Sequence, residues 1–331
     1  MKLVKKKLIR NRTYYYLEYT IRVNGKRLNY SKYVGDKLPF NLKELFLVFF
    51  EELTEFVLTK LGDKEKKYFP ENAIRTIEKA KSKYLLYNHE LFMSELSLFK
   101  TLYCILFVLN SNRAEGSKVT RSNIEEVMLK RVKPKTFIEK EIVNSIDAMN
   151  FAFSKEFKWN SKGIKTIHQE LFKNISPEIA GKFKKSNVIV NNSETTDWKS
   201  VSKEMKDLLH WMKKNKKIIY PPQLALEFHW RFEKIHPFED GNGRIGRILL
   251  NAILLEHGYA PMTFFSENHQ SYCNAIAKAC EGKKHPLAKV FVDCVKKTML
   301  AIDKYHDEQI ITGGSSKIGK WEIQRGKIRL S

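Results

Sequence analysis

Residues 13–34 alternate between apolar and polar side chains, a period of two that predicts β-strands. Asn24-Gly25 supplies a favoured two-residue turn between the two halves. The sequence therefore predicts a β-hairpin with basic flanks. Its interleaved Tyr and Lys/Arg side chains suit either packing on the rest of the protein or contact with nucleic acid. One face of the first strand carries Tyr15, Leu17, Tyr19, Ile21 and Val23.

From about residue 38 onward, apolar residues recur every three or four positions, which is typical of amphipathic helices. The segment 248–255 is apolar on nearly every side and predicts a central, buried helix. A short strand and turn are predicted at 186–196, where Val188, Ile189 and Val190 precede two asparagines. The region of about 38–110 is predicted to be helical, with amphipathic spacing from Leu42 to Val57 and another helix at 90–110. Further helices are predicted at about 121–131, 137–155, 163–174, 200–214, 222–235, 268–280 and 285–305.

Charge adds a constraint that the apolar pattern does not supply. The 331 residues include 60 Lys plus Arg against 37 Asp plus Glu, a formal net charge of +23. The electrostatic field of this positive charge favours nucleotides, nucleic acid or an anionic membrane surface as partners, although a lysine-rich solvated surface would give the same net charge. The apolar content of 43% excludes a collagen-like or wholly disordered chain.

Cysteine and apolar patterning bear on the compartment. Cys104, Cys273, Cys280 and Cys294 form no C-x-x-C pair and no zinc spacing, so buried, reduced thiols are expected. The apolar runs fall short of a membrane span, and the charged N-terminus is followed by no signal-like apolar segment. These features predict a soluble, cytoplasmic protein.

Residues 236–247 read His-Pro-Phe-Glu-Asp-Gly-Asn-Gly-Arg-Ile-Gly-Arg and concentrate the candidate chemistry of the chain. Gly241 and Gly243 let the backbone approach a ligand closely, and the start of the following helix favours anions. Arg244 and Arg247 share a helix face and can both grip phosphate oxygens. An acid that can hold Mg²⁺ and a histidine that can take a proton complete a set suited to phosphoryl or nucleotidyl transfer. These two side chains are Asp240 and His236.

The segment resembles the active-site motif of the Fic family, His-x-Phe-x-Asp/Glu-Gly-Asn-Gly-Arg-x-x-Arg, at every fixed position. The likeness extends over roughly residues 118–305. It implies a mainly α fold, with a Fic-type helical core and a short β-hairpin flap, preceded here by the N-terminal hairpin and a helical extension. It also implies an enzyme that moves AMP from ATP, with Mg²⁺, onto a Tyr, Ser or Thr hydroxyl of another protein.

The resemblance assigns roles to individual residues. His236 would accept the hydroxyl proton, Asp240 would bind Mg²⁺, and Asn242 with the backbone of Gly243 would form the anion hole for the α-phosphate. Arg244 would hold the region of the β-phosphate and Arg247 the γ-phosphate. The flap, through Val188, Ile189 and Val190, would pair with the backbone of the target. Weaker candidates for contact with the nucleotide are Asn251 and Tyr272, for which packing is the competing interpretation; Gly241 belongs to the same loop.

Many Fic proteins carry an inhibitory Ser/Thr-x-x-x-Glu-Gly/Asn motif whose glutamate pairs with the second arginine of the active-site motif. The pattern occurs twice here, at 111–116 and at 263–268. The first copy, with Ser111, Glu115 and Gly116, ends a predicted helix upstream of the core. This matches the class with an N-terminal inhibitory helix, so the sequence predicts that Glu115 pairs with Arg247.

Three other interpretations compete with this one. A near match to the phosphate-binding P-loop at 314–320 fails because Trp321 replaces the required Ser/Thr. A nucleic-acid-binding regulatory protein with a secondary Fic domain would explain the basic termini. A Fic enzyme could also use another nucleotide donor or remove AMP. The predicted division is 1–36 basic hairpin, 37–117 helical region, 118–305 Fic core and 306–331 basic tail.

Overall fold

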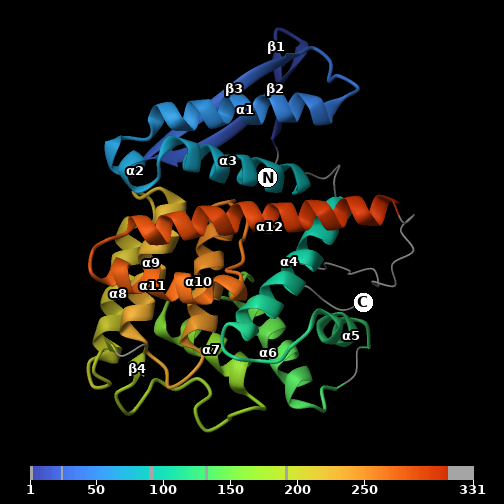
Figure 1. The fold of residues 1–331 in the computed structure, drawn as a ribbon. Helices are drawn as coiled ribbons and strands as arrows, with labels where there is room; N and C mark the ends of the chain where they lie inside the picture. The colour runs from blue at the N-terminus through green and yellow to red at the C-terminus, as the bar shows by residue number, and fades with distance from the viewer. Residues whose placement is uncertain (1–2, 24, 89–92, 131–132, 191–192, 312–331) are drawn as a thin grey trace.

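The structure, a computed structural model, describes residues 3–23, 25–88, 93–130, 133–190 and 193–311. Within these ranges the protein is mainly α-helical, as the apolar spacing predicts, with a small antiparallel sheet near the N-terminus. Figure 1 shows the sheet and its helices above a larger helical body, with the long helix α12 (His285–Ile311) running between the two.

The N-terminal sheet has three strands in the order β1 (Val4–Ile9), β2 (Arg12–Val23) and β3 (Lys26–Gly35). Strands β2 and β3 form the predicted hairpin, and Gly25 takes a φ of +77° in its turn. Asn24, the other predicted turn residue, lies outside the described residues. The sequence analysis missed β1, because three consecutive lysines (residues 5–7) hide its alternation.

One face of the sheet is covered by α1 (Leu42–Lys60), where the Tyr30 ring packs against Phe49 and Phe56 at centroid distances of 5.5 and 5.1 Å. The helix begins after Asn41, whose side chain accepts a hydrogen bond from the backbone N–H of Glu44. Two further helices, α2 (Asp63–Tyr68) and α3 (Glu71–Tyr87), lead back toward the helical body.

A buried polar network fastens α3 to the helical body. Oε1 of Glu78 accepts hydrogen bonds from the hydroxyls of Tyr220 and Tyr259, both at 2.7 Å, while Oε2 pairs with Lys81 at 3.0 Å. Because each buried charge has a partner, the network can hold the two parts together without leaving polar groups unsatisfied.

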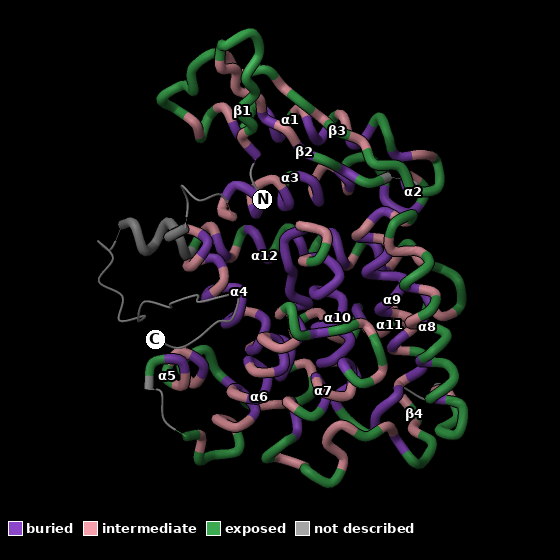
Figure 2. Tube along the Cα trace, turned by 180° about the vertical axis from the view of Figure 1, so that it is seen from behind, coloured by how far each residue is buried: buried purple, intermediate pink, exposed green. Residues whose placement is uncertain are grey.

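Helix α10 lies at the centre of the body, and Figure 2 shows buried residues concentrated around it. It packs against α9, α6, α4 and α7, which confirms the predicted central helix. The flap hairpin consists of β4 (Ile189–Val190) and β5 (Ser193–Glu194), and its two turn asparagines lie outside the described residues. The other helical elements are α4 (Met93–Arg113), α5 (Arg121–Lys130), α6 (Phe137–Ala152), α7 (Ser161–Phe172), α8 (Val201–Asn215), α9 (Pro221–Ile235), α10 (Asn242–Glu256), the short 3₁₀ helix η2 (Ser266–Asn268) and α11 (His269–Cys280).

Several helix boundaries differ from the sequence prediction, and α4, for example, ends at Arg113 and not near residue 110. Helix α6 ends at Ala152 and not near residue 155, and α12 continues to Ile311 where the prediction stopped near 305. The tail from residue 312, including the P-loop-like segment, lies outside the described residues. None of the described helices combines the length and apolar character needed to cross a membrane.

Candidate active site

The motif forms a tight loop between α9 and α10. His236 ends α9 with a φ of +50°, and Gly241 precedes α10 with a φ of +76°, so both ends of the loop take the left-handed conformation. A side chain at Gly241 would collide with the Phe172 ring, which explains why glycine is required there. The loop therefore delivers the imidazole next to the first turn of the buried helix.

Two motif side chains hold the loop from inside. The fully buried Phe238 ring stacks on His168 at a centroid distance of 4.1 Å. The Asn242 amide donates to the carbonyl of Phe238 and accepts from its N–H, both at 2.9 Å. These contacts use the amide oxygen and one amide N–H of Asn242 to hold the loop, and its backbone N–H lies at the start of α10, where an anion hole is expected.

His168, on α7, is a part of the site that the sequence analysis missed. Its Nδ1 accepts a hydrogen bond from the N–H of Gly181 at 2.8 Å, which leaves Nε2 to donate to the carbonyl of Asp240 at 3.3 Å. Burial lowers the pKa of His168 to about 4, so the ring is neutral at pH 7 and keeps this pattern. A lone histidine on a helix face gives no sequence signal of such a role.

His236, the expected proton acceptor, is largely buried. Its imidazole is 14% exposed, and burial together with the charge of Lys184 lowers its pKa to about 4. The ring is therefore unprotonated at neutral pH, as a general base must be. Its Nδ1 lies 4.0 Å from Oε2 of Glu233, which leaves Nε2 for a substrate.

Glu233, one turn before His236 on α9, is a second residue that sequence reasoning missed. Burial raises its pKa to about 8, and a side chain at Gly246 would overlap its Oε1 atom. Among the described residues neither Oε1 of Glu233 nor Nδ1 of His229, 3.9 Å away, has a hydrogen-bond partner. A carboxyl group whose pKa is raised by burial therefore lies between His229 and His236.

The two arginines of the motif have different surroundings. Arg244 lies 3.3 Å from Asp240 and 3.9 Å from Glu141, with its guanidinium over the Phe172 ring. Arg247 is only 2% exposed and points toward the end of α4. The two guanidinium groups thus come from one helix face but contact different elements, as their i, i+3 spacing allows.

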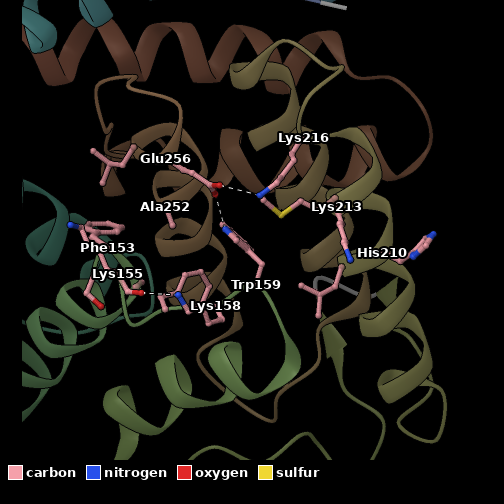
Figure 3. Close-up of a pocket in the computed structure, with 15 residues that line it drawn as sticks. Phe153, Lys155, Lys158, Trp159, His210, Lys213, Lys216, Ala252 and Glu256 are labelled. Atoms are coloured by element: carbon pink, nitrogen blue, oxygen red, sulfur yellow. Dashed lines mark hydrogen bonds and ion pairs between the residues drawn. The ribbon is translucent and has the colours of Figure 1, made fainter. Parts of the chain in front are cut away.

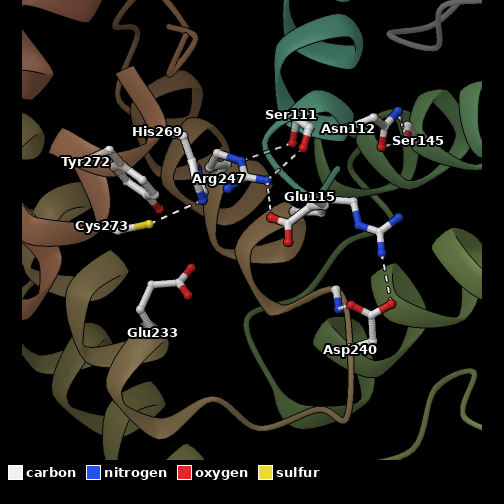
Figure 4. Close-up of polar contacts among 12 residues, drawn as sticks. Ser111, Asn112, Glu115, Ser145, Glu233, Asp240, Arg247, His269, Tyr272 and Cys273 are labelled. Atoms are coloured by element: carbon white, nitrogen blue, oxygen red, sulfur yellow. Dashed lines mark hydrogen bonds and ion pairs between the residues drawn. The ribbon is translucent and has the colours of Figure 1, made fainter. Parts of the chain in front are cut away.

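Three oxygen atoms surround the Arg247 guanidinium. Nε donates to Oγ of Ser111 at 3.0 Å, and Nη2 donates to the Ser111 carbonyl at 2.9 Å and to Oε1 of Glu115 at 2.7 Å. Figure 4 shows Ser111 and Glu115 meeting Arg247 from the α4 side. Burial alone would raise the pKa of Glu115, but the charge and hydrogen bond of Arg247, together with the charges of Arg244 and His269, lower that pKa below its ordinary value, so the pair is ionised.

The end of α4 is itself held in place. Asn112 and Ser145 exchange hydrogen bonds of 3.1 and 3.2 Å, and Ser117 donates to Glu141 at 2.7 Å. Gly116 takes a φ of +85° in the turn that follows the helix. These contacts to α6 fix the turn that presents the Glu115 carboxylate.

The second copy of the inhibitory pattern lies elsewhere. Glu267 is exposed in η2 and pairs with Lys297 of α12 at 2.9 Å. Thr263, at the start of that copy, is buried and its N–H donates to Thr298. Of the two glutamates, Glu115 is therefore the one that contacts Arg247.

Asp240 suits a metal that substrate phosphates help to bind. Its side chain is 59% exposed at the mouth of the loop, and Figure 4 shows it apart from the Glu115–Arg247 pair. Within the described ranges, no three His, Cys, Asp or Glu side chains gather into a metal cluster. A single accessible carboxylate fits Mg²⁺, which keeps several waters and binds through one or two carboxylates and phosphate oxygens.

The weaker nucleotide candidates are held by the fold. Asn251 is fully buried, and its amide bonds the backbone of Arg247 and Met262, which leaves no polar atom for a nucleotide. Tyr272 is 5% exposed, and its hydroxyl lies 2.7 Å from Nε2 of His229. The geometry thus gives Asn251 a packing role, and the Tyr272 hydroxyl contacts α9 through His229.

The flap is tied to the catalytic loop at its base. The N–H of Lys184 donates to the Pro237 carbonyl at 2.9 Å, and its Nζ reaches Oγ1 of Thr195 at 2.6 Å. Ile189 at the flap is 69% exposed, so an apolar side chain faces solvent there. Lys184 thus connects the segment before the flap with the loop that follows His236 and with Thr195 after the flap.

A cavity of about 790 Å³ opens at the opposite end of α10 from the motif. Its wall includes Trp159 and Lys216, which both contact the carboxylate of Glu256 (Figure 3). None of the motif residues lines it, so this hollow is separate from the candidate active site.

Comparison with known proteins agrees with this geometry. A family model described as Fic/DOC family matches residues 158–254. A protein adenylyltransferase Fic from Nematostella vectensis is 27% identical over 206 residues, covering 60% of this chain and 48% of the relative. One from Drosophila virilis is 25% identical over 199 residues, covering 58% and 41%. The chain thus spans about half the length, or less, of these curated relatives.

Solved structures share the fold. A Fic domain containing signaling protein from Bacteroides thetaiotaomicron superposes with a TM-score of 0.60 at 21% identity, over 74% of this chain and all of that one. Fic-1 from C. elegans gives a TM-score of 0.54 at 21% identity, over 75% of this chain and 81% of that one. Residues 158–254 thus match the Fic/DOC family, and the architecture around them is shared with solved Fic structures.

Proposed function

We propose that the protein is an adenylyltransferase that moves AMP from ATP to a hydroxyl side chain of another protein, and that Glu115 holds it inactive. The observation that carries the proposal is the complete motif folded around a buried arginine whose guanidinium is bound to Glu115. The curated relatives that match at 25–27% identity are named protein adenylyltransferases, which supports the same reaction for this chain.

The proposed transfer begins at His236. Its unprotonated Nε2 takes the proton of the target hydroxyl while that oxygen attacks the α-phosphorus of ATP. A bond forms between this oxygen and phosphorus, and the bond to the bridging oxygen breaks, so pyrophosphate leaves with its electron pair. The backbone N–H groups at the start of α10 stabilise the charge that develops on the α-phosphate.

The remaining residues position the nucleotide. Arg244 and Arg247 would grip the outer phosphates, and the flap would present the target strand by backbone pairing. Bound Mg²⁺ would neutralise phosphate charge, with Asp240 as its protein ligand. In the autoinhibited state the Glu115 carboxylate occupies Arg247, so ATP binds with its α-phosphorus out of line with the incoming hydroxyl.

Intact-mass spectrometry tests the reaction. The Glu115→Gly variant is incubated with Mg²⁺ and separately with ATP, GTP, CTP or UTP, and the mass added by self-modification identifies the group transferred. We expect the mass of AMP from ATP, and none in a His236→Ala, Glu115→Gly double variant. A different adduct would assign another donor, and removal of AMP from a premodified protein without any transfer would replace transfer by the reverse activity.

A further inference from the structure

The N-terminal sheet has a second face that the proposed reaction does not use. The side chains of Leu17, Tyr19 and Ile21 point inward and are buried. Their neighbours in β2 point the other way, and the register places residues of β1 and β3 beside them. This outer face is defined by the even-numbered residues 12–22 of β2 with the odd-numbered residues 5–9 of β1 and 27–33 of β3.

The outer face is strongly basic. Lys5, Lys7, Arg12, Arg22 and Arg27 lie on it, and all five are exposed. Among the described residues of the face, the one acid is Glu18, and it already pairs with Lys7 at 2.5 Å. The face therefore attracts an anionic partner, in line with the net charge of +23.

Two of these charges oppose each other directly. Arg22 of β2 and Arg27 of β3 are cross-strand partners in the register. Like charges placed opposite each other on neighbouring strands destabilise a sheet, because they repel each other. An anion bound over the two arginines would offset this repulsion. The arrangement therefore favours binding of an anionic ligand and adds no stability to the sheet by itself.

Hydrogen-bonding side chains occupy the middle of the face. Thr20 donates to Oδ1 of Asn29 at 2.7 Å, which leaves the amide nitrogen of the exposed Asn29 as a donor for a ligand. Ser31 lies next along β3 and contacts Glu18 at 3.4 Å. Arg, Asn, Ser and Thr are side chains that read base edges in the grooves of a duplex.

The aromatic side chains favour a duplex over a single strand. Tyr16 and Tyr33 tilt against each other at a centroid distance of 5.4 Å, Tyr14 leans on Tyr33 at 6.2 Å, and Lys7 lies over the Tyr16 ring at 4.3 Å. Tyr14 and Tyr16 lean on Tyr33, which is 55% exposed, and Lys7 covers the Tyr16 ring, so fewer open ring faces remain for the base stacking that single-stranded nucleic acid needs.

We propose that the outer face of the N-terminal sheet binds double-stranded DNA in its major groove. Three strands about 4.8 Å apart span roughly 10 Å, and the groove of B-form DNA is about 12 Å wide. Sheets are among the elements that enter it. The major groove of A-form RNA is too deep and narrow for side chains to read. Figure 1 places this sheet at the end of the molecule away from the flap.

Fluorescence anisotropy with a labelled duplex of about 20 base pairs tests the proposal on the full chain. The affinity should fall steeply between about 50 and 200 mM salt, because each phosphate contact adds about 0.9 to the logarithmic slope. In Arg22→Ala, Arg27→Ala we expect the affinity at low salt to drop by about tenfold or more and the slope to decrease by about 2. The matched control Lys203→Ala, Lys206→Ala removes two exposed charges from α8 and should change the affinity by less than about threefold.

Thermal unfolding separates recognition from misfolding. Because the two arginines repel each other, their double replacement should leave the melting temperature unchanged or higher. The proposal is overturned if wild-type protein fails to bind the duplex at low salt, if both double variants lose affinity equally, or if a single strand binds as tightly. Retention on anionic phospholipid vesicles without duplex binding would assign the face to a membrane surface instead.

Discussion

Nη2 of Arg247 lies 2.7 Å from Oε1 of Glu115, so the buried guanidinium of the motif is already bound to a carboxylate. We predict that Glu115→Gly raises the rate of AMP transfer by about 10²-fold, because misalignment of a reacting group suppresses a rate by about that amount. The measurement is self-modification with labelled ATP. ATP affinity should change less than the rate, because the rest of the phosphate cradle is present in both states.

Two variants control this prediction. Arg247→Ala in the Glu115→Gly background should erase the gain, since both substitutions act through one contact. Glu267→Gly removes the glutamate of the second copy, which pairs with Lys297 on the surface, and should leave the rate unchanged. Activation by Glu267→Gly and not by Glu115→Gly would show that the inhibitory role belongs to the other copy.

The same substitution should change stability. Removing Glu115 leaves the Arg247 guanidinium, which is 2% exposed, with Ser111 as its one hydrogen-bond partner among the described residues. A buried group that loses a partner costs about 1–3 kcal/mol. We expect Glu115→Gly to unfold at a lower temperature than wild type. ATP should recover more of this loss in the variant than it adds to wild type, because its phosphates replace the lost carboxylate. Equal shifts on adding ATP would mean that no phosphate reaches Arg247.

The buried position of His236 predicts an unusual pH dependence of the transfer rate. Its pKa is lowered to about 4, so the imidazole stays unprotonated well below the ordinary value of 6.5. The transfer rate of Glu115→Gly should therefore be nearly constant from about pH 7.5 to about pH 5 and fall only as pH approaches 4. His236→Ala should abolish transfer at every pH while leaving ATP binding nearly intact. Half-maximal activity near pH 6.5 would place the base in an ordinary, solvated environment.

The motif could be read from the sequence because its residues are contiguous and chemically distinctive. The contacts that complete the site join distant segments, as when Ser111 meets Arg247 across 136 positions or His168 meets Asp240 across 72. Ser111 was predicted only through the family pattern, and a single His168 on an apolar helix face carries no pattern at all. Contacts between residues so far apart in the chain are set by tertiary packing, and the local spacing of residues does not predict them.

The strands show the same division. The hairpin of β2 and β3 follows from alternation, but β1 has lysines on both of its faces and no apolar stripe. Lys6 of β1 points to the face that packs on α1 yet stays exposed at the edge of the sheet, where water solvates it. Pairing with β2 supplies the order that the side-chain pattern of β1 does not encode.

Asp240 predicts dependence on a divalent cation. We propose that its exposed carboxylate would share Mg²⁺ with the nucleotide phosphates. Asp240→Ala, or excess EDTA, should abolish transfer by Glu115→Gly and weaken nucleotide binding measured by calorimetry. Asp240 also pairs with Arg244 at 3.3 Å, so Asp240→Asn, which keeps the shape, should reproduce the effect of EDTA. Undiminished transfer in EDTA would remove the metal from the mechanism.

The raised pKa of Glu233 predicts that the stability of the folded protein depends on pH. Its pKa is raised by burial to about 8, against an ordinary value near 4.5, so the folded protein keeps a proton that the unfolded chain releases. The contribution of this proton to the free energy of unfolding is complete below about pH 4.5 and is lost as pH rises toward 8. The positive charge of Arg247 opposes this shift and the negative charge of Glu115 adds to it.

Glu233→Gln keeps the shape of the protonated carboxyl group and cannot ionise, so its stability should not decline over this range. Wild type and variant should melt together near pH 5, and the variant should melt higher at about pH 8.5, by roughly 5 °C or more for a difference of a few kcal/mol. Glu204→Gln, at an exposed position of α8, is the matched control and should follow wild type. Parallel curves for wild type and Glu233→Gln would mean that Glu233 is ionised in the folded protein at neutral pH, with a partner for its charge.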